Sequence, residues 1–354
     1  MRIGIFDPYL DDLGGGEKYM MTIASCLSKQ HEVDVFWDNN KDLDNLIHRF
    51  SLDLSKIKIV PNIFSPKTPF LKRFIKTRHY DLIIFLSDGS IPIISCKLLV
   101  HIQQPLEQMQ ARSLWDKVKL SRIQSFFCNS VYTRSFIDKK FSLKTTVLYP
   151  PVSFQPKQIK KENIILHVGR FRVRNVSADD YKKQIVMISK FKEMIKNGLN
   201  NWEFVLAVSI QEKDALEFEK MKKSAQGFPV RFIINQTNDK LWDIYSKAKI
   251  YWHATGFGED LNKRPELAEH FGISTVEAMG AGAVPVVINE GGQREIVENG
   301  KNGFLWNSLD ELEEKTLKLI SDEKLLQELS KIASESSKRF SEDNFCQKVN
   351  ELIK

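Results

Sequence analysis

No run of 18 apolar residues occurs in this chain of 354 residues, although apolar residues make up 42% of it. A bilayer-spanning helix needs about 20 such residues, so the sequence predicts no membrane-spanning helix. We also expect no secretory leader, because the opening residues MRIGIFDPYL predict a strand followed closely by acidic residues. The apolar content is sufficient for full cores, and the length is that of two ordinary domains.

Cysteine is scarce, and its positions show no metal-binding or redox spacing. The four cysteines, Cys26, Cys96, Cys128 and Cys346, are widely scattered. Structural metal sites and redox motifs place cysteines only a few residues apart. We therefore expect reduced thiols rather than disulfides, and a cytoplasmic protein.

Acidic residues are few in one part of the chain. The whole chain has a formal net charge of +7, but residues 51–150 hold 16 lysines and arginines against 6 acidic residues. This local excess of +10 contrasts with −3 for the rest of the sequence. A basic region of this kind indicates an acidic partner surface: a membrane, an anionic acceptor or a nucleic acid.

Strand-like and helix-like segments alternate in two blocks. The first block ends at Pro150-Pro151, and the polar residues 155–162 predict a linker. Repeated βα units predict an α/β fold with two doubly wound, Rossmann-like parallel sheets that face a cleft. We assign residues 1–154 to the first domain, 155–340 to the second, and about 341–354 to a final helix. The predicted strands are Arg2–Asp7, Glu32–Asp38, Lys56–Pro61, Asp81–Ser87, Lys97–Ile102, Ser125–Cys128, Asn163–Gly169, Glu203–Val208, Val230–Ile234, Ile250–His253 and Ala283–Ile288, and the clearest helices are Glu17–Lys29 and Lys182–Asn197.

Residues 266–300 contain the pattern that is most informative about function. Ser274 to Glu277 fits a capping box, which predicts a helix that begins at about Thr275. The free N–H groups and the dipole of such a helix end attract an anion, most simply a phosphate. A buried strand and a second glycine pair, Gly291-Gly292, follow. This order is typical of nucleotide binding at the carboxyl ends of a parallel sheet.

Two carboxylates accompany this phosphate site. Glu269 and Glu277 have seven residues between them, and Gly272 lets the backbone approach a ligand closely. Taken alone, Glu277 is equally well explained as a helix cap and Glu269 as a solvated acid. The whole arrangement rarely arises for structural reasons. Binding of a sugar would explain the two carboxylates, because they accept charge-assisted hydrogen bonds from sugar hydroxyls.

This stretch resembles the sugar-nucleotide site of retaining glycosyltransferases of family 4 (glycosyl transferases group 1), which have the GT-B fold. The resemblance implies that Glu269 contacts the donor sugar and that Glu277 binds the ribose hydroxyls. It further implies that the helix end at Gly272, Ile273 and Ser274 holds the donor diphosphate. The final helix is expected, again by resemblance, to pack back on the first domain.

The run Leu166–Phe171 resembles the family's glycine-arginine-phenylalanine strand end, which a lysine normally follows within a few residues. The resemblance implies that Arg170 and this lysine clamp the diphosphate and offset the charge on the leaving group. Here the loop 172–181 is longer than usual, so the lysine is either Lys182 or Lys183. We predict Lys183, directly before Gln184, with an ordinary surface lysine as the alternative.

A glycine-rich turn, Gly14-Gly15-Gly16, lies between the first strand and the first helix, where backbone N–H groups can reach a phosphate. A nicotinamide site is one alternative, because Asp38 ends the second strand. The fingerprint G-x-G-x-x-G fails, however, since Tyr19 stands where its last glycine belongs. The resemblance implies that Gly15 and Gly16 face the donor diphosphate, and a plain tight turn remains the other alternative.

Two histidines end predicted strands. By resemblance, His101 lies near the transferred sugar, although a lone histidine is as often structural. His253 resembles a family segment that leads into the glutamate turn, and a structural role is favoured for it. Glu295, after the second glycine pair, either caps a helix or lines the site.

The segment Lys67–His79 combines an apolar helical stripe with basic residues. Such a helix suits an anionic membrane surface, and the alternative is a helix that packs its stripe on its own sheet. A second basic and aromatic stretch is Arg112–Arg122, which contains Trp115.

The sequence therefore predicts a retaining hexosyltransferase. Its donor is a nucleoside-diphosphate sugar, with GDP-mannose the first choice and UDP-glucose the second, and its acceptor is a glycan or a lipid-linked glycan. No cofactor or metal is expected, because no Asp-x-Asp pair ends a strand near the site. The alternatives are a GT-B sugar-nucleotide epimerase and a catalytically silent sugar-nucleotide-binding subunit. A nucleic-acid partner is not expected, because it leaves the two glutamates unexplained.

Overall fold

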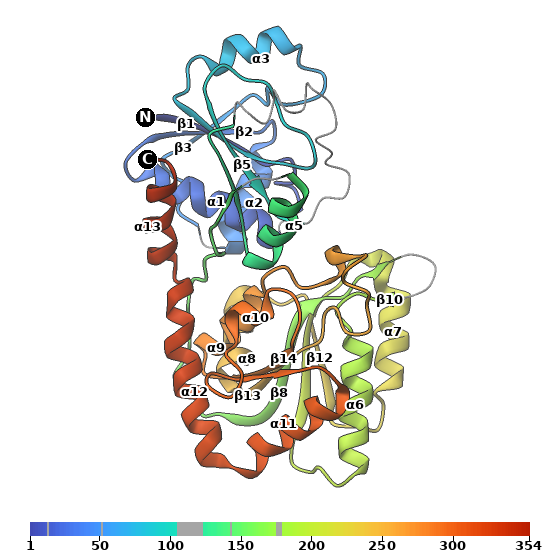
Figure 1. The fold of residues 1–354 in the computed structure, drawn as a ribbon. Coiled ribbons are helices and arrows are strands. Elements are labelled where there is room, and N and C mark those ends of the chain that lie inside the picture. The colour runs from blue at the N-terminus through green and yellow to red at the C-terminus, as the bar shows by residue number, and fades with distance from the viewer. Residues whose placement is uncertain (13, 51, 105–122, 142–143, 175–178) are drawn as a thin grey trace. The chain divides into compact units, whose positions relative to one another are not determined.

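The computed structural model describes residues 1–12, 14–50, 52–104, 123–141, 144–174 and 179–354 (Figure 1). The chain divides into two compact units, Met1–Pro151 with Glu342–Lys354, and Val152–Ser341. The division lies three residues before the expected boundary at residue 154, and the last helix belongs to the first unit. Within the described residues, no helix combines the length and apolarity that crossing a bilayer requires.

The first unit is built on a parallel sheet. Its described strands lie in the order β3-β2-β1-β4-β5-β6-β7, and every pairing is parallel. The chain thus starts in the middle of the sheet and winds outward in both directions, which is the doubly wound arrangement. The strands are β1 (Arg2–Phe6), β2 (Glu32–Phe36), β3 (Ile57–Val60), β4 (Leu82–Leu86), β5 (Lys97–Ile102), β6 (Ser125–Cys128) and β7 (Thr145–Val147), and the helices are α1 (Gly15–Ser28), α2 (Asn40–Phe50), α3 (Phe70–Thr77), α5 (Val131–Phe141) and α13 (Glu342–Leu352).

Side chains that alternate along these strands fill two cores, one on each face of the sheet. Ile3 and Ile5 of β1 pack with buried residues of α1, α2 and α13. Phe6 and Phe36 pack instead with Phe64, in the segment that leads into α3, and with other residues of that face. Figure 1 shows α1 and α2 on one side of the sheet and α3 on the other.

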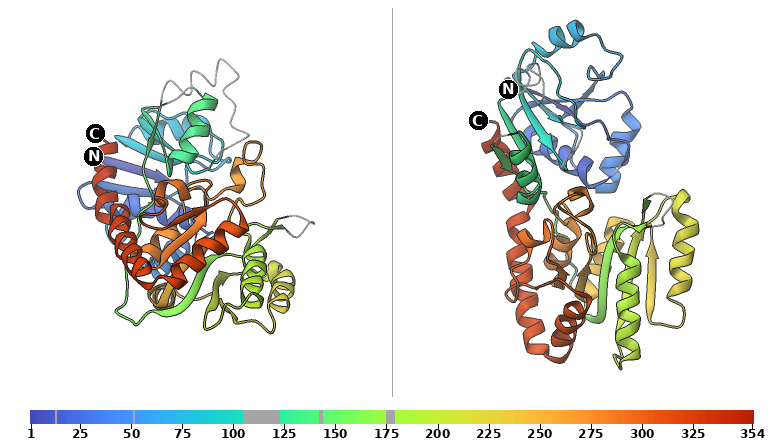
Figure 2. Two further views of the ribbon diagram at one scale, coloured as in Figure 1. Left: turned by 60° about the horizontal axis from the view of Figure 1, so that its bottom comes forward. Right: turned by 45° about the vertical axis from the view of Figure 1, so that its right-hand side comes forward.

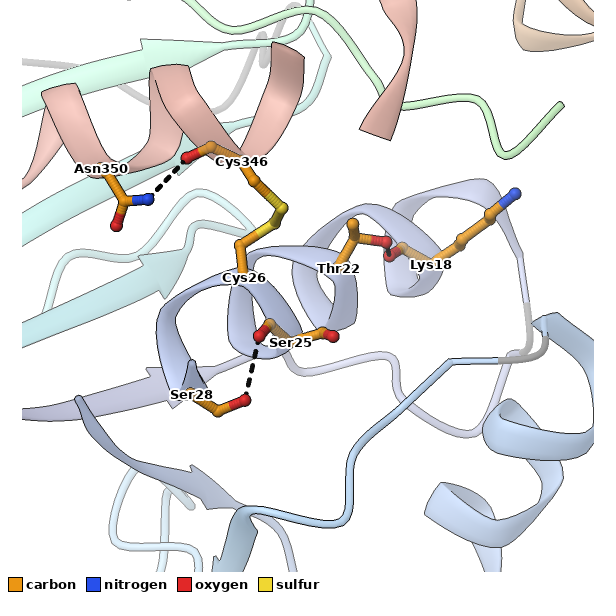
Figure 3. The surroundings of a disulfide bond; sticks show 7 residues. All are labelled: Lys18, Thr22, Ser25, Cys26, Ser28, Cys346 and Asn350. Carbon is orange, nitrogen blue, oxygen red and sulfur yellow. Dashed lines mark hydrogen bonds between the residues drawn. A yellow bond between two sulfur atoms is a disulfide. The ribbon is translucent and has the colours of Figure 1, made fainter. Parts of the chain in front are cut away.

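A disulfide joins the first and last helices of the chain. Cys26 of α1 is bonded to Cys346 of α13, with 5.2 Å between their Cα atoms and a sequence separation of 320 residues (Figure 3). The expectation of reduced, unpaired cysteines is therefore wrong for these two residues. The reason is tertiary: α13 returns to pack on α1, a contact that cysteine spacing cannot reveal. Cys96 and Cys128 do not take part in a disulfide.

The second unit repeats the architecture. Its main sheet has the order β12-β11-β8-β13-β14-β15 with parallel pairings, and β9 and β10 form a separate antiparallel ribbon. The strands are β8 (Glu162–Arg170), β9 (Val173–Arg174), β10 (Asp179–Asp180), β11 (Glu203–Ser209), β12 (Val230–Ile234), β13 (Ala248–His253), β14 (Val284–Ile288) and β15 (Phe304–Trp306). The helices are α6 (Gln184–Lys196), α7 (Ala215–Ser224), α8 (Asn238–Lys247), α9 (Ile273–Gly280), α10 (Gln293–Ile296), α11 (Leu309–Ser321) and α12 (Glu323–Ser337).

Alternation along β13 directs side chains to both faces of this sheet. Ile250 and Trp252 enter the core that also contains buried residues of α6, α7 and α11. Tyr251, between them, points the other way and hydrogen-bonds to Ser274 of α9. Figures 1 and 2 show helices on both sides of this sheet. The predicted α/β class with two doubly wound parallel sheets is confirmed.

Candidate functional site

The helix α9 begins earlier than the sequence predicts. Its N-cap is Gly272, at φ 116° and ψ 56°, and Ile273 is its first residue. A Cβ on Gly272 would lie 2.3 Å from the Nε2 atom of buried Gln293, and an L side chain rarely adopts this φ. The predicted capping box at Ser274 is therefore wrong, and the Ser274 Oγ instead accepts a 2.7 Å hydrogen bond from the Tyr251 hydroxyl. The first-turn N–H groups of a helix have no acceptor within the helix, so this end suits an anion.

Glu269 lies just before this turn, between two nitrogen-bearing side chains. Its Oε2 atom is 2.6 Å from the Lys182 Nζ atom and 3.0 Å from the His253 Nε2 atom. The exposed fractions of the three side chains are 19% for Glu269, 14% for Lys182 and 1% for His253. His253, for which a structural role was favoured, therefore donates a hydrogen bond directly to Glu269, the residue predicted to contact the sugar.

The pKa shifts show which of these groups are charged. Burial raises the pKa of Glu269, but the charge of Lys182 and the hydrogen bond from His253 outweigh burial and hold it well below its ordinary value. Burial lowers the pKa of His253, which favours the neutral imidazole. Burial and the charge of Arg170 lower the pKa of Lys182, yet Glu269 raises it overall. The site thus contains a carboxylate and an ammonium group, with a neutral histidine beside them.

The second glycine pair positions the backbone of Glu269. The Gly292 N–H donates a 2.8 Å hydrogen bond to the Glu269 carbonyl oxygen. A Cβ on Gly291, whose φ is 60°, would lie only 2.3 Å from the same oxygen. Glycine at these positions therefore allows two turns that are far apart in sequence to lie backbone against backbone.

Lys182 pairs with Glu269, whereas Lys183, the predicted diphosphate lysine, does not. Asp180 fixes this geometry, because its carboxylate accepts hydrogen bonds from the Lys182 N–H at 3.1 Å and the Ile185 N–H at 2.8 Å. Lys183 has a left-handed backbone at φ 57° and ψ 33°, and its Nζ atom lies 2.5 Å from the Glu259 Oε1 atom. The structure therefore does not bring Lys183 to the carboxylate that Lys182 pairs with.

Arg170 stands at the carboxyl end of β8, where its side chain is exposed. Its positive charge acts on Lys182, since it lowers the pKa of that lysine. Two cations near each other at a strand end, beside a helix N-terminus, form an arrangement that a diphosphate would satisfy.

Glu277 lies on α9, half-buried. Its Oε2 atom accepts a 2.8 Å hydrogen bond from the hydroxyl of Tyr245 on α8. Burial, and then the charge of Glu277, raises the pKa of Tyr245 well above its ordinary value, so this tyrosine remains a donor. Tyr245 was not predicted from sequence, because nothing in the local pattern places α8 against α9.

The remaining predicted site residues belong to the first unit. Gly15 and Gly16 open α1, and a Cβ on Gly16 would lie 2.4 Å from the Gln103 side chain. His101 is 1% exposed and stacks between Tyr19 and Phe127, with ring centroids 4.6 and 4.7 Å away. Burial lowers the pKa of His101 to about 3. Its surroundings are those of a packed core ring, and its predicted role toward the sugar stays a prediction.

The part of the chain that the structure describes contains no group of three or more His, Cys, Asp or Glu side chains arranged to hold a metal ion.

Comparison of the sequence with known proteins identifies relatives. The curated relatives include a GDP-Man:Man(3)GlcNAc(2)-PP-Dol alpha-1,2-mannosyltransferase of Dictyostelium discoideum, 27% identical over 237 residues, which are 63% of this chain and 45% of that protein. A Campylobacter jejuni GalNAc-alpha-(1->4)-GalNAc-alpha-(1->3)-diNAcBac-PP-undecaprenol alpha-1,4-N-acetyl-D-galactosaminyltransferase is 25% identical over 259 residues, 67% of this chain and 68% of that protein. The chain thus spans less than half the length of the first relative.

Solved structures share the fold. A crystal structure of Anabaena HepE in complex with UDP and glucose superposes with a TM-score of 0.71 over 100% of this chain and 99% of that one, at 18% identity. A glycosyltransferase of Rickettsia africae gives a TM-score of 0.76 at 14% identity, over 99% and 97% of the two chains. These likenesses show the fold alone, and they confirm the GT-B architecture. The family model that describes glycosyl transferases group 1 matches residues 151–336, which contain every second-unit residue of the candidate site, and the chain belongs to this family.

Proposed function

We propose that the chain is a retaining glycosyltransferase of family 4 that moves a hexose from a nucleoside-diphosphate sugar to a glycan or lipid-linked acceptor. The observation that carries the proposal is the ionised Glu269, held by Lys182 and His253 next to the N-terminus of α9. A fixed anion is a strong acceptor for sugar hydroxyls, and a helix N-terminus is a site for a phosphate. Few ligands other than a sugar nucleotide need both within one turn.

Each part of the donor has an assigned partner. Glu269 accepts hydrogen bonds from the transferred sugar, and Glu277, oriented by Tyr245, accepts them from the ribose. The diphosphate lies against the first N–H groups of α9, with Arg170 and Lys182 on its other side. We now assign Lys182 as the diphosphate lysine, because Lys183 turns away to Glu259.

These cations explain how the leaving group is stabilised. Negative charge grows on the diphosphate as the glycosidic bond breaks, and fixed positive charges there lower the barrier. Arg170 and Lys182 supply this charge, so we infer transfer that does not require a divalent ion. Transfer that persists in a chelator supports this inference, and transfer that a chelator abolishes and Mg²⁺ or Mn²⁺ restores contradicts it.

The relatives support the choice of donor and stereochemistry. The Dictyostelium relative is named for GDP-mannose, an α-linked donor, and its name and that of the Campylobacter relative both specify α-linked products. Retention with GDP-mannose is therefore the first choice for this chain, and UDP-glucose is the second. Both names also specify acceptors on polyprenyl diphosphates, which favours a lipid-linked glycan and a cytoplasmic, peripheral enzyme.

A thermal-shift screen of GDP, UDP, ADP and dTDP, followed by transfer assays with the matching sugars, tests the proposal. A ligand at 100 times its dissociation constant adds about 2.7 kcal/mol of stability, which a melting curve resolves easily. The Glu269→Gln variant, which keeps the side-chain shape without its charge, is expected to lose transfer. Absence of a shift with every nucleotide contradicts the proposal.

Incubation with donor alone separates the alternatives. Slow hydrolysis of the donor supports a transferase. Formation of an epimer identifies a GT-B epimerase, and tight binding without turnover identifies a silent binding subunit.

A further inference from the structure

The helix α3 exposes an unusual amount of apolar surface. Phe70, Leu71 and Ile75 are 53%, 65% and 49% exposed. They are three of the nine large apolar side chains classed as exposed among the described residues, yet α3 has only eight residues. Scattered single apolar residues are ordinary on a protein surface, but a cluster of this kind marks a contact site.

The opposite face of α3 fixes the orientation of the helix. Thr77 is fully buried, and its Oγ1 atom lies 2.9 Å from the Ser95 Oγ atom. The Arg73 Nε–H donates a 3.1 Å hydrogen bond to the Ile63 carbonyl, and its guanidinium lies 5.8 Å from the centre of the Phe64 ring. The alternative in which the stripe packs on its own sheet is therefore wrong for Phe70, Leu71 and Ile75, because Arg73 and Thr77 occupy the inward face.

Basic side chains flank the exposed apolar residues. Lys67, Lys72, Lys76 and Arg78 are all exposed, and none of them forms an ion pair with an acid among the described residues. They belong to the stretch 51–150, in which basic residues exceed acidic ones by 16 to 6. The other basic stretch of this region, Arg112–Arg122 with Trp115, lies outside the described residues. An apolar strip bordered by unpaired cations is complementary to a bilayer, whose acyl region takes the apolar groups and whose anionic headgroups take the bases.

We propose that this face of α3, formed by Phe70, Leu71, Ile75, Lys72 and Lys76, docks the protein on an anionic lipid bilayer, together with Lys67 in the turn before the helix. Figure 1 and the right-hand view of Figure 2 both place α3 at the rim of its unit, with one side turned outward. The helix lies in the interface, because eight residues are far too few to span a bilayer. The proposal does not depend on the transferase chemistry, since no residue of this face belongs to the second unit.

Cosedimentation with vesicles tests the proposal directly. The protein is expected to bind vesicles of phosphatidylcholine and phosphatidylglycerol in equal parts, and to bind pure phosphatidylcholine much more weakly. Each basic residue near an anionic surface contributes on the order of a fivefold increase in partitioning, so Lys72→Glu with Lys76→Glu should weaken binding by at least about 25-fold. Raising the salt from 0.1 M to 1 M shortens the Debye length from about 10 Å to about 3 Å and should release the protein.

Two further variants separate the contribution of the apolar side chains to vesicle binding from the effect of net charge. Leu71→Ser with Ile75→Ser removes the apolar contact without changing the net charge, and should weaken binding to the same vesicles at 0.1 M salt. Lys324→Glu with Lys331→Glu on α12 makes the same change in net charge on another exposed surface, and it should bind like the wild type. Arg73 is left unchanged in all variants, because its inward hydrogen bond makes it structural.

Several results would overturn the proposal. Equal losses in the α3 and α12 charge variants mean that net charge, not this face, governs binding. If the protein does not cosediment with anionic vesicles at low salt, the proposal of membrane docking is rejected. Binding to an oligonucleotide but not to vesicles would show that the partner of this face is a nucleic acid and not a bilayer. A concentration-dependent dimer that Leu71→Ser with Ile75→Ser abolishes would show that the face is a contact between two copies of the chain.

Discussion

Two carboxylates with little exposure to solvent, one in each unit, differ in charge: Asp7 is protonated and Glu269 is ionised. Asp7 follows β1 and is 0% exposed; its Oδ1 accepts a 2.9 Å hydrogen bond from the Tyr9 N–H. Its Oδ2 has no hydrogen-bond partner among the described residues. Burial, together with the charges of Glu17 and Asp11, raises the pKa of Asp7 to about 8. Glu269, in contrast, has a pKa well below its ordinary value.

The neighbours of each acid explain the difference. Both acids lose hydration, and burial by itself raises the pKa of each one. Glu269 has a lysine at 2.6 Å, whereas the charged groups that act on Asp7 are themselves acids. Asp7 avoids the free-energy cost of a buried charge because it stays protonated. Glu269 stays ionised because the charge of Lys182 offsets that cost. Burial of an acid therefore does not predict its charge, and only Glu269 offers a permanent anion to a ligand.

Replacing each acid by its amide gives the largest expected contrast between the two sites. Glu269→Gln should abolish transfer and cost about 3–5 kcal/mol of stability, because it leaves Lys182 without its counter-charge in a largely buried site. Asp7→Asn should not destabilise the protein at pH 7, because the amide has the shape of the neutral folded Asp7 and, unlike Asp7, does not ionise when the chain unfolds. Chemical unfolding of both variants measures the two changes in stability. Similar losses in both would remove the distinction between a paired and a protonated acid.

Substitutions of the two adjacent lysines test whether Lys182, and not Lys183, is the partner of Glu269 and the diphosphate lysine. Lys182→Ala should lower turnover more than it lowers donor affinity and should destabilise the protein, since Glu269 loses its counter-charge. Lys183→Ala removes the partner of Glu259, a pair with side chains 15% and 23% exposed, and should leave the kinetics unchanged. Steady-state kinetics with the identified donor compare them. Loss of turnover in Lys183→Ala alone would restore the prediction made from sequence.

The pH dependence of stability should differ in sign for the two acids. Asp7 binds a proton up to about pH 8 when folded but only up to about pH 4 when unfolded, so its contribution to stability is lost as pH rises between these values. The slope is at most about 1.4 kcal/mol per pH unit. Asp7→Asn should therefore gain stability relative to the wild type from pH 5 to pH 8. Glu269 contributes above its unfolded pKa, and its contribution is lost in acid as pH falls through the folded value.

Melting temperatures of wild type and Asp7→Asn across this range provide the measurement. Asp44→Asn is the matched control, because Asp44 is exposed and is not among the charges that act on Asp7. A difference between wild type and Asp7→Asn that does not change with pH would show that Asp7 is ionised like Glu269.

The smallest effect is expected at Glu277. Tyr245→Phe removes the hydroxyl that orients this carboxylate and should cost about 1 kcal/mol of stability, the net value of a typical hydrogen bond. Donor affinity should fall while turnover at saturating donor stays the same. A large fall in turnover would place Glu277 at the reacting sugar rather than at the ribose.

Much of the fold and part of the site follow from sequence because they depend on local order. The strand Lys97–Ile102 has the same bounds in the prediction and in the structure, since a short apolar run with β-branched residues specifies a buried strand. Glu269 and Gly291 were found because a helix end, a buried strand and a glycine pair follow one another in the chain. Such features need no knowledge of contacts between distant segments.

The differences between the prediction and the structure arise from backbone conformation and from contacts across the fold. The capping box failed because Gly272, with its positive φ, starts α9 before Ser274. Lys183 was chosen by its place next to Gln184, but the backbone hydrogen bonds to Asp180 direct Lys182 to Glu269 instead. The left-handed φ of Lys183, which the sequence does not reveal, turns its side chain toward Glu259.

The bond between Cys26 and Cys346 gives the chain a particular topology. The backbone leaves the first unit at Pro151 and returns at Glu342, so the bond closes a covalent ring that contains the whole second unit. A protease that cuts this ring once opens it without releasing a fragment, and the two pieces separate on a denaturing gel only after reduction. If the second unit unfolds, both of its ends remain attached to the first unit, which limits the distance between these ends before the unit refolds.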